Sequence, residues 1–383
     1  MSQPSPESDL DSTSIRLQDH FASLVDPRRR KVTYPLVNVV TIAVCAVICG
    51  ADDFVAIATW GRLKRDWLET ILDLEAGIPS HDRFNAIFQA LDPGAFEKCL
   101  LSWIAELREA TAGQVVAIDG KTLRGSFDKA SGKSAIHMVS AWATANRLSL
   151  GQVVVDAKSN EITAIPALLR LLELRGCLVT IDAMGCQTAI AEAILDREAD
   201  YVLAVKDNQP TLHRAIEDFF TSQMEDDFAK VEVGRYETKE KGHGRIEHRS
   251  YYVCDAPAGL ADRERWKGLA AIGAAINITT RDGKASDAVR YYILSRRLEA
   301  KEFADAVRSH WGIENSLHWQ LDVSFGEDAC RVRLGLADAN LSVVRRAALG
   351  LLKNEKSEKI GVKNKRLAAA CNTHYMEKVI TGS

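Results

Sequence analysis

The sequence predicts a mixed α/β protein with helical segments at both ends, because the pattern of apolar residues changes three times along the chain. Residues 13–112 repeat apolar positions at helical spacing without a strand signal. Residues 113–224 alternate short apolar runs with helical patterns, which is typical of a sheet covered by helices. Residues 225–299 are rich in strand patterns, and helical patterns return over residues 300–383.

The composition is that of a globular protein long enough for two or three domains. The chain has 383 residues, of which 46% are hydrophobic, and its formal net charge is −3. This charge excludes a strongly basic protein, so any nucleic-acid surface has to come from local clusters. The eight cysteines include no C-x-x-C pair, so we expect reduced core residues and neither a disulfide framework nor a zinc site.

The N-terminal segment shows no targeting signal. Residues 1–12 are polar and rich in serine and proline, which predicts a disordered tail and no signal peptide. The most apolar stretch, residues 36–51, contains Asn38 and Thr41, so it is short for a membrane span and predicts a buried helix. We therefore expect a cytoplasmic protein that has no membrane partner.

Capping residues mark the helices of residues 13–112, which we predict to be an all-helical N-terminal domain. Ser80 precedes a helix at 81–91, and Asp92 with the following proline begins the next helix. Asp52 is expected to begin a further helix that runs through Trp60 and Trp67.

Two apolar runs in the next segment each lead to an aspartate. Residues 115–118 lead to Asp119, and residues 178–181 lead to Asp182. Short continuous apolar runs predict buried central strands, and a carboxylate at their ends is costly to desolvate unless a cation meets it. The other elements that we expect here are strands at 135–143, 148–155 and 201–205, and helices at 163–174, 187–197 and after Pro210.

A third carboxylate lies beyond the β-rich segment, whose strands we expect at 231–236, 247–253, 271–279 and 289–294. Glu314 falls in a predicted helix at 301–319, on the same stripe as Trp311 and Leu317, which should face the core. Alone, each aspartate is explained as a turn residue and the glutamate as an ion-paired one. Together, the three suggest one site that binds divalent metal.

These motifs resemble the DDE transposases of bacterial insertion sequences, in particular the ISAs-type, or H-repeat-associated, group. The similarity runs from about His20 to the C-terminal region. The segments that carry it are Ala117–Lys121, Thr180–Gly185, Ala204–Gln209, Gly242–Glu247 and His310–Asp328.

The resemblance implies a ribonuclease-H-like catalytic core at 113–224, completed by a helix after a β-rich insertion at 225–299. It places the catalytic and metal-binding triad on Asp119, Asp182 and Glu314. The implied cofactor is Mg²⁺, for which Mn²⁺ substitutes, since hard oxygen ligands suit both ions. The implied activity is metal-dependent DNA cleavage and strand transfer.

The resemblance also implies the partners. These are double-stranded DNA, as terminal repeats and as target, and a second copy of the chain when DNA is bound. We expect the helical N-terminal domain to bind DNA, and the protein to be associated with the nucleoid.

Basic and polar residues near these motifs, together with the dense basic cluster at residues 28–31, are our candidates for DNA contact. Related transposases often carry a tyrosine, an arginine and a lysine around the glutamate, where this chain has Val307, His310 and Leu321; neighbouring residues are expected to replace them. The candidates are Arg28, Arg29, Arg30, Lys121, Arg124, Lys206, Asn208, Gln209, Arg308, His310 and His318.

Two alternatives stay open. One is a non-catalytic or domesticated descendant that binds DNA without cutting it, and the other is a stand-alone ribonuclease-H-like nuclease. The sequence does not favour a nucleotide-cofactor enzyme, because no G-x-G-x-x-G or Walker pattern follows a strand.

Overall fold

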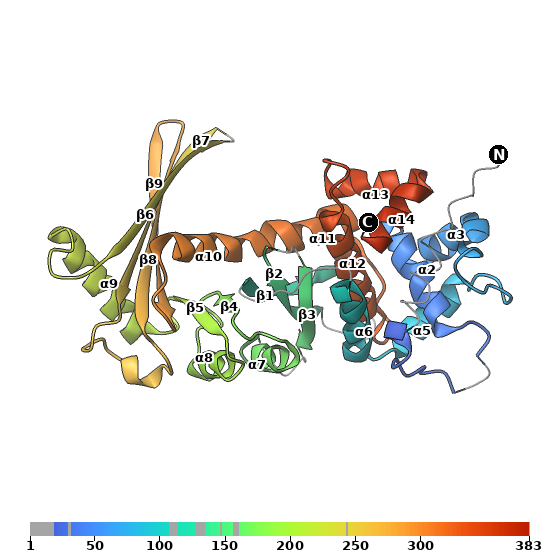
Figure 1. The fold of residues 1–383 in the computed structure, drawn as a ribbon, viewed down its shortest axis with the longest axis horizontal. Helices are drawn as coiled ribbons and strands as arrows, with labels where there is room; N and C mark the ends of the chain where they lie inside the picture. Colours follow the sequence, from blue (N-terminus) through green and yellow to red (C-terminus); the bar gives the residue numbers. More distant parts are fainter. Residues whose placement is uncertain are drawn as a thin grey trace, which may run out of the picture.

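The protein is elongated, with helices at one end and long strands at the other, and a helix runs between them (Figure 1). The structure is a computed structural model that describes residues 19–29, 32–106, 114–126, 135–145, 148–155, 161–242 and 244–382. The predicted mixed α/β class is confirmed.

The N-terminal helices begin at capping side chains. They are α2 (Leu36–Ile48), α3 (Phe54–Leu63), α4 (Arg65–Leu68), α5 (His81–Ala90) and α6 (Pro93–Glu106). The side chains of Ser80 and Asp92 accept the predicted capping bonds of α5 and α6, from Arg83 N and Ala95 N. For α3 the capping residue is Asp53, one position after the expected Asp52, because Asp53 Oδ1 accepts the bond from Ala56 N at 2.8 Å.

The two ends of the chain share one hydrophobic core. Helices α12 (Ala337–Asn354), α13 (Val362–Cys371) and α14 (Thr373–Thr381) pack against α2, and α12 also packs against α5 and α6. The side chain of Asn340 donates to the carbonyls of Phe88 and Leu91, and Arg366 donates to the carbonyl of Val47. The boundary predicted at residue 112 lies outside the described residues. No described helix is long and apolar enough to cross a membrane.

All the described strands form one nine-stranded sheet, in the order β3-β2-β1-β4-β5-β9-β8-β7-β6. Its first part holds β1 (Val115–Leu123), β2 (Ile136–Ala143), β3 (Leu148–Val155), β4 (Leu178–Ile181) and β5 (Asp200–Val205). Strands β1, β4 and β5 are parallel, and β2 and β3 are antiparallel to their neighbours. The helices that follow these strands are α7 (Glu161–Leu171), α8 (Thr188–Leu195) and α9 (Pro210–Glu225).

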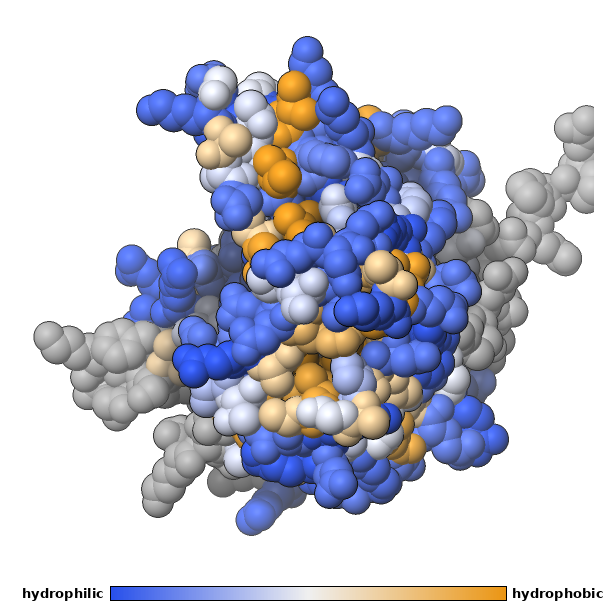
Figure 2. All heavy atoms as spheres, turned by 90° about the vertical axis from the view of Figure 1, so that its left-hand side faces the viewer, coloured by the Kyte–Doolittle hydropathy of each residue, from blue (hydrophilic) through white to orange (hydrophobic). Residues whose placement is uncertain are grey.

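The β-rich segment extends this same sheet. Its strands are β6 (Gly234–Gly242), β7 (Arg245–Asp255), β8 (Ala271–Arg281) and β9 (Lys284–Leu294). Strand β9 pairs antiparallel with β5, so the segment continues the core sheet through main-chain hydrogen bonds. The first strand begins at Gly234, three residues later than we predicted, and runs on to Gly242. Figure 2 views this end of the molecule, whose surface is mostly hydrophilic with hydrophobic groups gathered along the middle.

Strand β1 does not end at Asp119, as we predicted, but continues to Leu123. Its parallel pairing with β4 stops at Ile118, opposite Ile181, while its pairing with β2 continues from Asp119 to Leu123. The apolar run therefore marks only the part of the strand that has neighbours on both sides. Because Ile118 and Ile181 are register partners, Asp119 and Asp182 follow at the same level of adjacent parallel strands.

The helix that carries Glu314 has three parts. Helix α10 (Ala300–Ile313) packs on the sheet, a π-helical turn covers Glu314–His318, and α11 (Trp319–Phe325) follows. A short 3₁₀ turn, η4 (Glu327–Ala329), comes next.

A buried ion-pair network ties β1 to this region. Glu327 accepts from Lys121 Nζ of β1 at 3.0 Å, from Ser342 Oγ of α12 at 2.6 Å, and from Arg346 Nη1 of α12 at 3.3 Å. Lys121 also pairs with Asp322 of α11. Burial alone would raise the pKa of Glu327, but Arg346 and Lys121 hold it at about 2. We call these five residues the Glu327 network.

The Glu327→Gln substitution is expected to lower the free energy of unfolding at pH 7 by about 3–5 kcal/mol, because it removes the counter-charge of buried Arg346 and one of the two counter-charges of Lys121. The pKa of Glu327 is depressed from its ordinary 4.5, so its contribution is complete above pH 4.5 and is lost as the pH falls through 2. Urea denaturation at several pH values measures this loss.

The matched control is Glu302→Gln, which removes an exposed ion pair with Arg296 and should change stability by less than about 1 kcal/mol. Equal effects of the two substitutions would show that the Glu327 network does not hold the fold together.

Candidate metal centre

The two aspartates reach the site at the same level of adjacent strands, Asp119 from within β1 and Asp182 directly after β4. Asp182 Oδ1 accepts from the backbone N–H of Met184 at 3.1 Å and of Gly185 at 3.3 Å. A Cβ atom at Gly185 would collide with the Ile181 side chain, so only glycine allows this turn. Asp119 Oδ1 accepts from the backbone N–H of Gly120 at 2.9 Å. These bonds fix both carboxylates at the same edge of the sheet.

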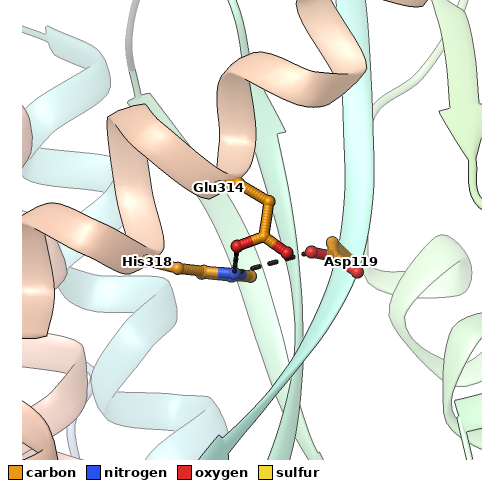
Figure 3. A group of neighbouring side chains, drawn as sticks. All are labelled: Asp119, Glu314 and His318. Carbon is orange, nitrogen blue, oxygen red and sulfur yellow. Dashed lines mark ion pairs between the residues drawn. The ribbon is translucent and has the colours of Figure 1, made fainter. Parts of the chain in front are cut away.

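Glu314 lies on the first residue of the π-helical turn. The backbone N–H of Trp319 donates to the Glu314 carbonyl, five residues back, which is the bond of a π-turn. Leu317 is buried as predicted. Trp311, predicted to face the core, is 46% exposed, and the Glu314 side chain is 59% exposed and does not face the core either. It points instead across to Asp119 on β1 (Figure 3).

The three carboxylates face one cavity, because Asp119, Asp182 and Glu314 all line it. A histidine joins them. Nδ1 of His318 lies 3.5 Å from Asp119 Oδ2 and 3.7 Å from Glu314 Oε2. Ligand atoms of Asp119, Glu314 and His318 all lie within 4.8 Å of one another. The structure therefore brings the three predicted carboxylates to one cavity, with an imidazole between two of them.

The electrostatics of this cluster favour a cation. Burial raises the pKa of Asp119 to about 7, and the carboxylates of Glu314 and Asp182 add to the rise. Burial, together with the positive charges of Arg346 and Lys121, lowers the pKa of His318 to about 3, so the imidazole is neutral at pH 7. The site therefore concentrates carboxylate oxygens that, among the described residues, form no ion pair with a lysine or arginine, which suits a hard divalent ion.

Four of the expected DNA-contact residues lie at or near the cavity. Lys206 is exposed and lines it. His310 also lines it, with Nδ1 3.2 Å from Thr180 Oγ1 and its pKa lowered by burial. The side-chain amides of Asn208 and Gln209 donate to the carbonyls of Ala183 and Cys186, so they shape the loop after Asp182.

Two expected DNA contacts do not fit the structure. Lys121 is buried in the Glu327 network, and its ammonium is shared between two carboxylates. His318 is 5% exposed, so its ring cannot reach a DNA backbone. In both cases the sequence showed a polar residue beside a motif but not the direction of its side chain.

The remaining candidates lie away from the carboxylates. Arg28 pairs with Asp26 at 2.5 Å, and Arg29 is exposed. Arg124 is 83% exposed, and Arg308 bonds Glu240 at 2.6 Å. Arg30 lies outside the described residues.

Sequence reasoning missed two residues that line the cavity beside Glu314. The guanidinium of Arg290, on β9, lies 4.0 Å from the ring centroid of Trp311, on α10. A local pattern could not reveal this pair, because it depends on β9 joining the core sheet. The position of His318 near Glu314 could be predicted, because His318 follows Glu314 by four residues and therefore lies on the same helical face.

Known protein families match almost the whole chain. The family described as "DDE_Tnp_1-associated" matches residues 18–104, and the family described as "Transposase DDE domain" matches residues 110–347.

Two relatives from Escherichia coli that are provisionally named as transposases are similar over nearly their full length. YncI of strain O157:H7 is 45% identical over 369 residues, which cover 95% of this chain and 94% of YncI. The H repeat-associated protein YhhI of strain K12 is 40% identical over 374 residues, which cover 96% of this chain and 98% of YhhI. Among solved structures, a piggyBac transposase synaptic complex with hairpin DNA matches this chain at 9% identity and a TM-score of 0.39. The match covers 97% of this chain and 79% of that one, and it is too weak to support a conclusion.

The Asp119→Asn substitution is expected to stabilise the metal-free protein at pH 8 by about 1–3 kcal/mol. The folded state holds the Asp119 proton to about pH 7, against an ordinary pKa of 3.8. Ionisation of this carboxyl therefore opposes folding, fully above pH 7 and hardly at all below pH 4. Thermal unfolding in chelator at pH 8 and at pH 5 should show a larger gain at pH 8.

The control is Asp207→Asn, which changes an exposed carboxyl and should be neutral within about 0.5 kcal/mol at either pH. A loss of stability in Asp119→Asn at pH 8 would contradict the crowding of carboxylates that we describe.

Proposed function

The chain belongs to the DDE transposases, in their H-repeat-associated group, and from this premise we propose that it cuts and joins DNA at the ends of an insertion sequence through Asp119, Asp182 and Glu314. Membership in this family implies that DNA is a partner and that a divalent metal ion is the cofactor. The observation that supports the triad is the register of β1 and β4, which sets the two aspartates level beside the helix of Glu314.

The first five strands support a ribonuclease-H-like core as part of the proposal. The order β3-β2-β1-β4-β5, with parallel strands at β1, β4 and β5, holds both aspartates at one edge. The glutamate comes from the helix that follows the strand-rich segment. This is the arrangement that the family resemblance implies.

The residues of the site fit Mg²⁺, with Mn²⁺ able to replace it. Their donors are carboxylate oxygens, and the raised pKa of Asp119 reflects the burial and negative charge that a divalent ion would offset. When bound, such an ion supplies Lewis acidity that activates a water or a 3′-hydroxyl and stabilises the leaving oxygen. The residues of the chain hold and orient it, and no side chain has to form a covalent bond to DNA.

Lys206 is the residue that we propose for contact with the DNA backbone at this site. It follows β5, is exposed, and lines the cavity of the carboxylates. A cation there would offset phosphate charge next to the reacting bond. Arg28 and Arg29 are proposed contacts further along the DNA. We also propose that two copies of the chain hold two element ends, at the nucleoid.

The first test of this function is a cleavage assay with Mg²⁺ and labelled DNA that carries the genomic flanks of the gene. Wild type should cut at the element boundary, and Glu314→Gln should cut at least about a hundredfold more slowly. Substitutions of residues that only hydrogen-bond to metal ligands already lower activity by up to about that factor, and a ligand itself should matter at least as much. DNA binding, followed on the same gel, should be unchanged.

Glu302→Gln is the matched control, since it makes the same chemical change on the same helix, at an exposed residue paired with Arg296. Binding without cleavage by wild type, with Mn²⁺ also tried, would favour a non-catalytic descendant. Cutting without end specificity or strand transfer would favour a stand-alone nuclease.

The Lys206→Ala substitution should weaken DNA binding several-fold and reduce the slope of log affinity against log salt by about 1, because one phosphate contact is lost. Fluorescence anisotropy over a range of salt concentrations measures both quantities. Lys267→Ala is the control, since Lys267 is held by Glu192 and Asp196. The same slope in wild type and Lys206→Ala would remove Lys206 from the interface.

A further inference from the structure

His318 is the one member of the carboxylate cluster that the triad does not account for. It is 5% exposed, although a polar ring is costly to bury without partners. Its Nε2 atom has no hydrogen-bond partner among the described residues. No hydrogen bond to Nε2 therefore orients the imidazole ring, and its polar contacts in the site are those of Nδ1.

The distances around Nδ1 do not fit hydrogen bonds. They are 3.5 Å to Asp119 Oδ2 and 3.7 Å to Glu314 Oε2, which is longer than the usual N–H···O range of about 2.7–3.2 Å. Ligands at about 2.0–2.2 Å from one cation lie roughly 3.0–3.5 Å from each other. Both distances from Nδ1 are thus close to the spacing of neighbouring ligands on a shared ion, and ligand atoms of the three residues all lie within 4.8 Å of one another.

The π-helical turn explains how the ring arrives there. Glu314 and His318 are its first and last residues, and both side chains lie on the side that faces Asp119 of β1. Figure 3 shows the two side chains leaving neighbouring turns of one helix and meeting Asp119. Turns of this kind often occur at functional sites.

We propose that His318 is itself a metal ligand, so that one cation position of the centre has two carboxylate oxygens and one imidazole nitrogen. This inference rests on the proposed function, because it assumes that the centre binds metal. Asp182 lies outside the group of three, so a second cation position beside Asp119 and Asp182 would have only oxygen ligands from the chain. The centre is then chemically asymmetric.

The nitrogen changes which ions the position prefers. Imidazole suits transition-metal ions such as Fe²⁺, Ni²⁺ and Zn²⁺, and carboxylates suit both Mg²⁺ and Mn²⁺. Of these last two, Mn²⁺ is itself a transition-metal ion and accepts a nitrogen ligand more readily than Mg²⁺. Removal of His318 should therefore lower Mn²⁺ affinity more than Mg²⁺ affinity. If the His318 side chain only filled space, its removal would lower the affinities for the two ions equally or change neither.

The test is pulsed electron paramagnetic resonance of the full-length protein loaded with Mn²⁺, without DNA. Wild type should show coupling of Mn²⁺ to a directly bound ¹⁴N nucleus. Growth with ¹⁵N-histidine should replace it by the ¹⁵N pattern, which assigns the nitrogen to a histidine in an unmutated, folded protein. His318→Gln should abolish the coupling and lower Mn²⁺ affinity at least about tenfold.

His310→Gln is the matched control, because His310 lines the same cavity but bonds Thr180, and it should keep the nitrogen coupling. Metal binding that depends on Asp119 but shows no nitrogen coupling, or coupling that survives in His318→Gln, would overturn the assignment of His318 alone. No Mn²⁺ binding, or binding that is unchanged in Asp119→Asn, would overturn both this inference and the proposed metal-dependent function.

Discussion

The carboxylate of Glu327 is the anchor on which the geometry of the site depends. It is buried and ionised, and it joins Lys121 of β1 to Ser342 and Arg346 of α12. Lys121 lies two residues after Asp119, on the same side of the strand. Glu327 itself follows Glu314 by one short helix. The network therefore locks the strand of one catalytic candidate to the helix of another, although the two are far apart in sequence.

Two buried carboxylates of this region have opposite electrostatic states. Cations of the chain hold the pKa of Glu327 at about 2, whereas burial and neighbouring carboxylates raise that of Asp119 to about 7. The first is satisfied internally and stabilises the fold. The second is not, which costs stability until a cation arrives from solution. Ion pairs behind the site thus stabilise the fold, and the carboxylate within the site is left free to bind a cation.

The sequence predicted features that depend on neighbouring residues, such as helix caps. It did not predict contacts between residues far apart in the chain. Ser80 and Asp92 were recognised as caps because the bonds that they accept are local. Asp119 and Asp182 were found because apolar runs precede them. The pairing of β9 with β5 and the shared core of α2 and α12 join residues far apart in sequence, so no local pattern records them. The π-turn was missed because its sequence keeps ordinary helical spacing, although that spacing does place His318 on the same face as Glu314.

Anomalous diffraction from crystals of the full chain grown with Mn²⁺ would show whether Asp119, Asp182 and Glu314 form one cation centre. We expect anomalous density within coordination distance of all three carboxylates, and its loss in Asp119→Asn crystals. Ordered protein with the carboxylates in place but no ion among them, or density confined to a surface site elsewhere, would contradict this expectation.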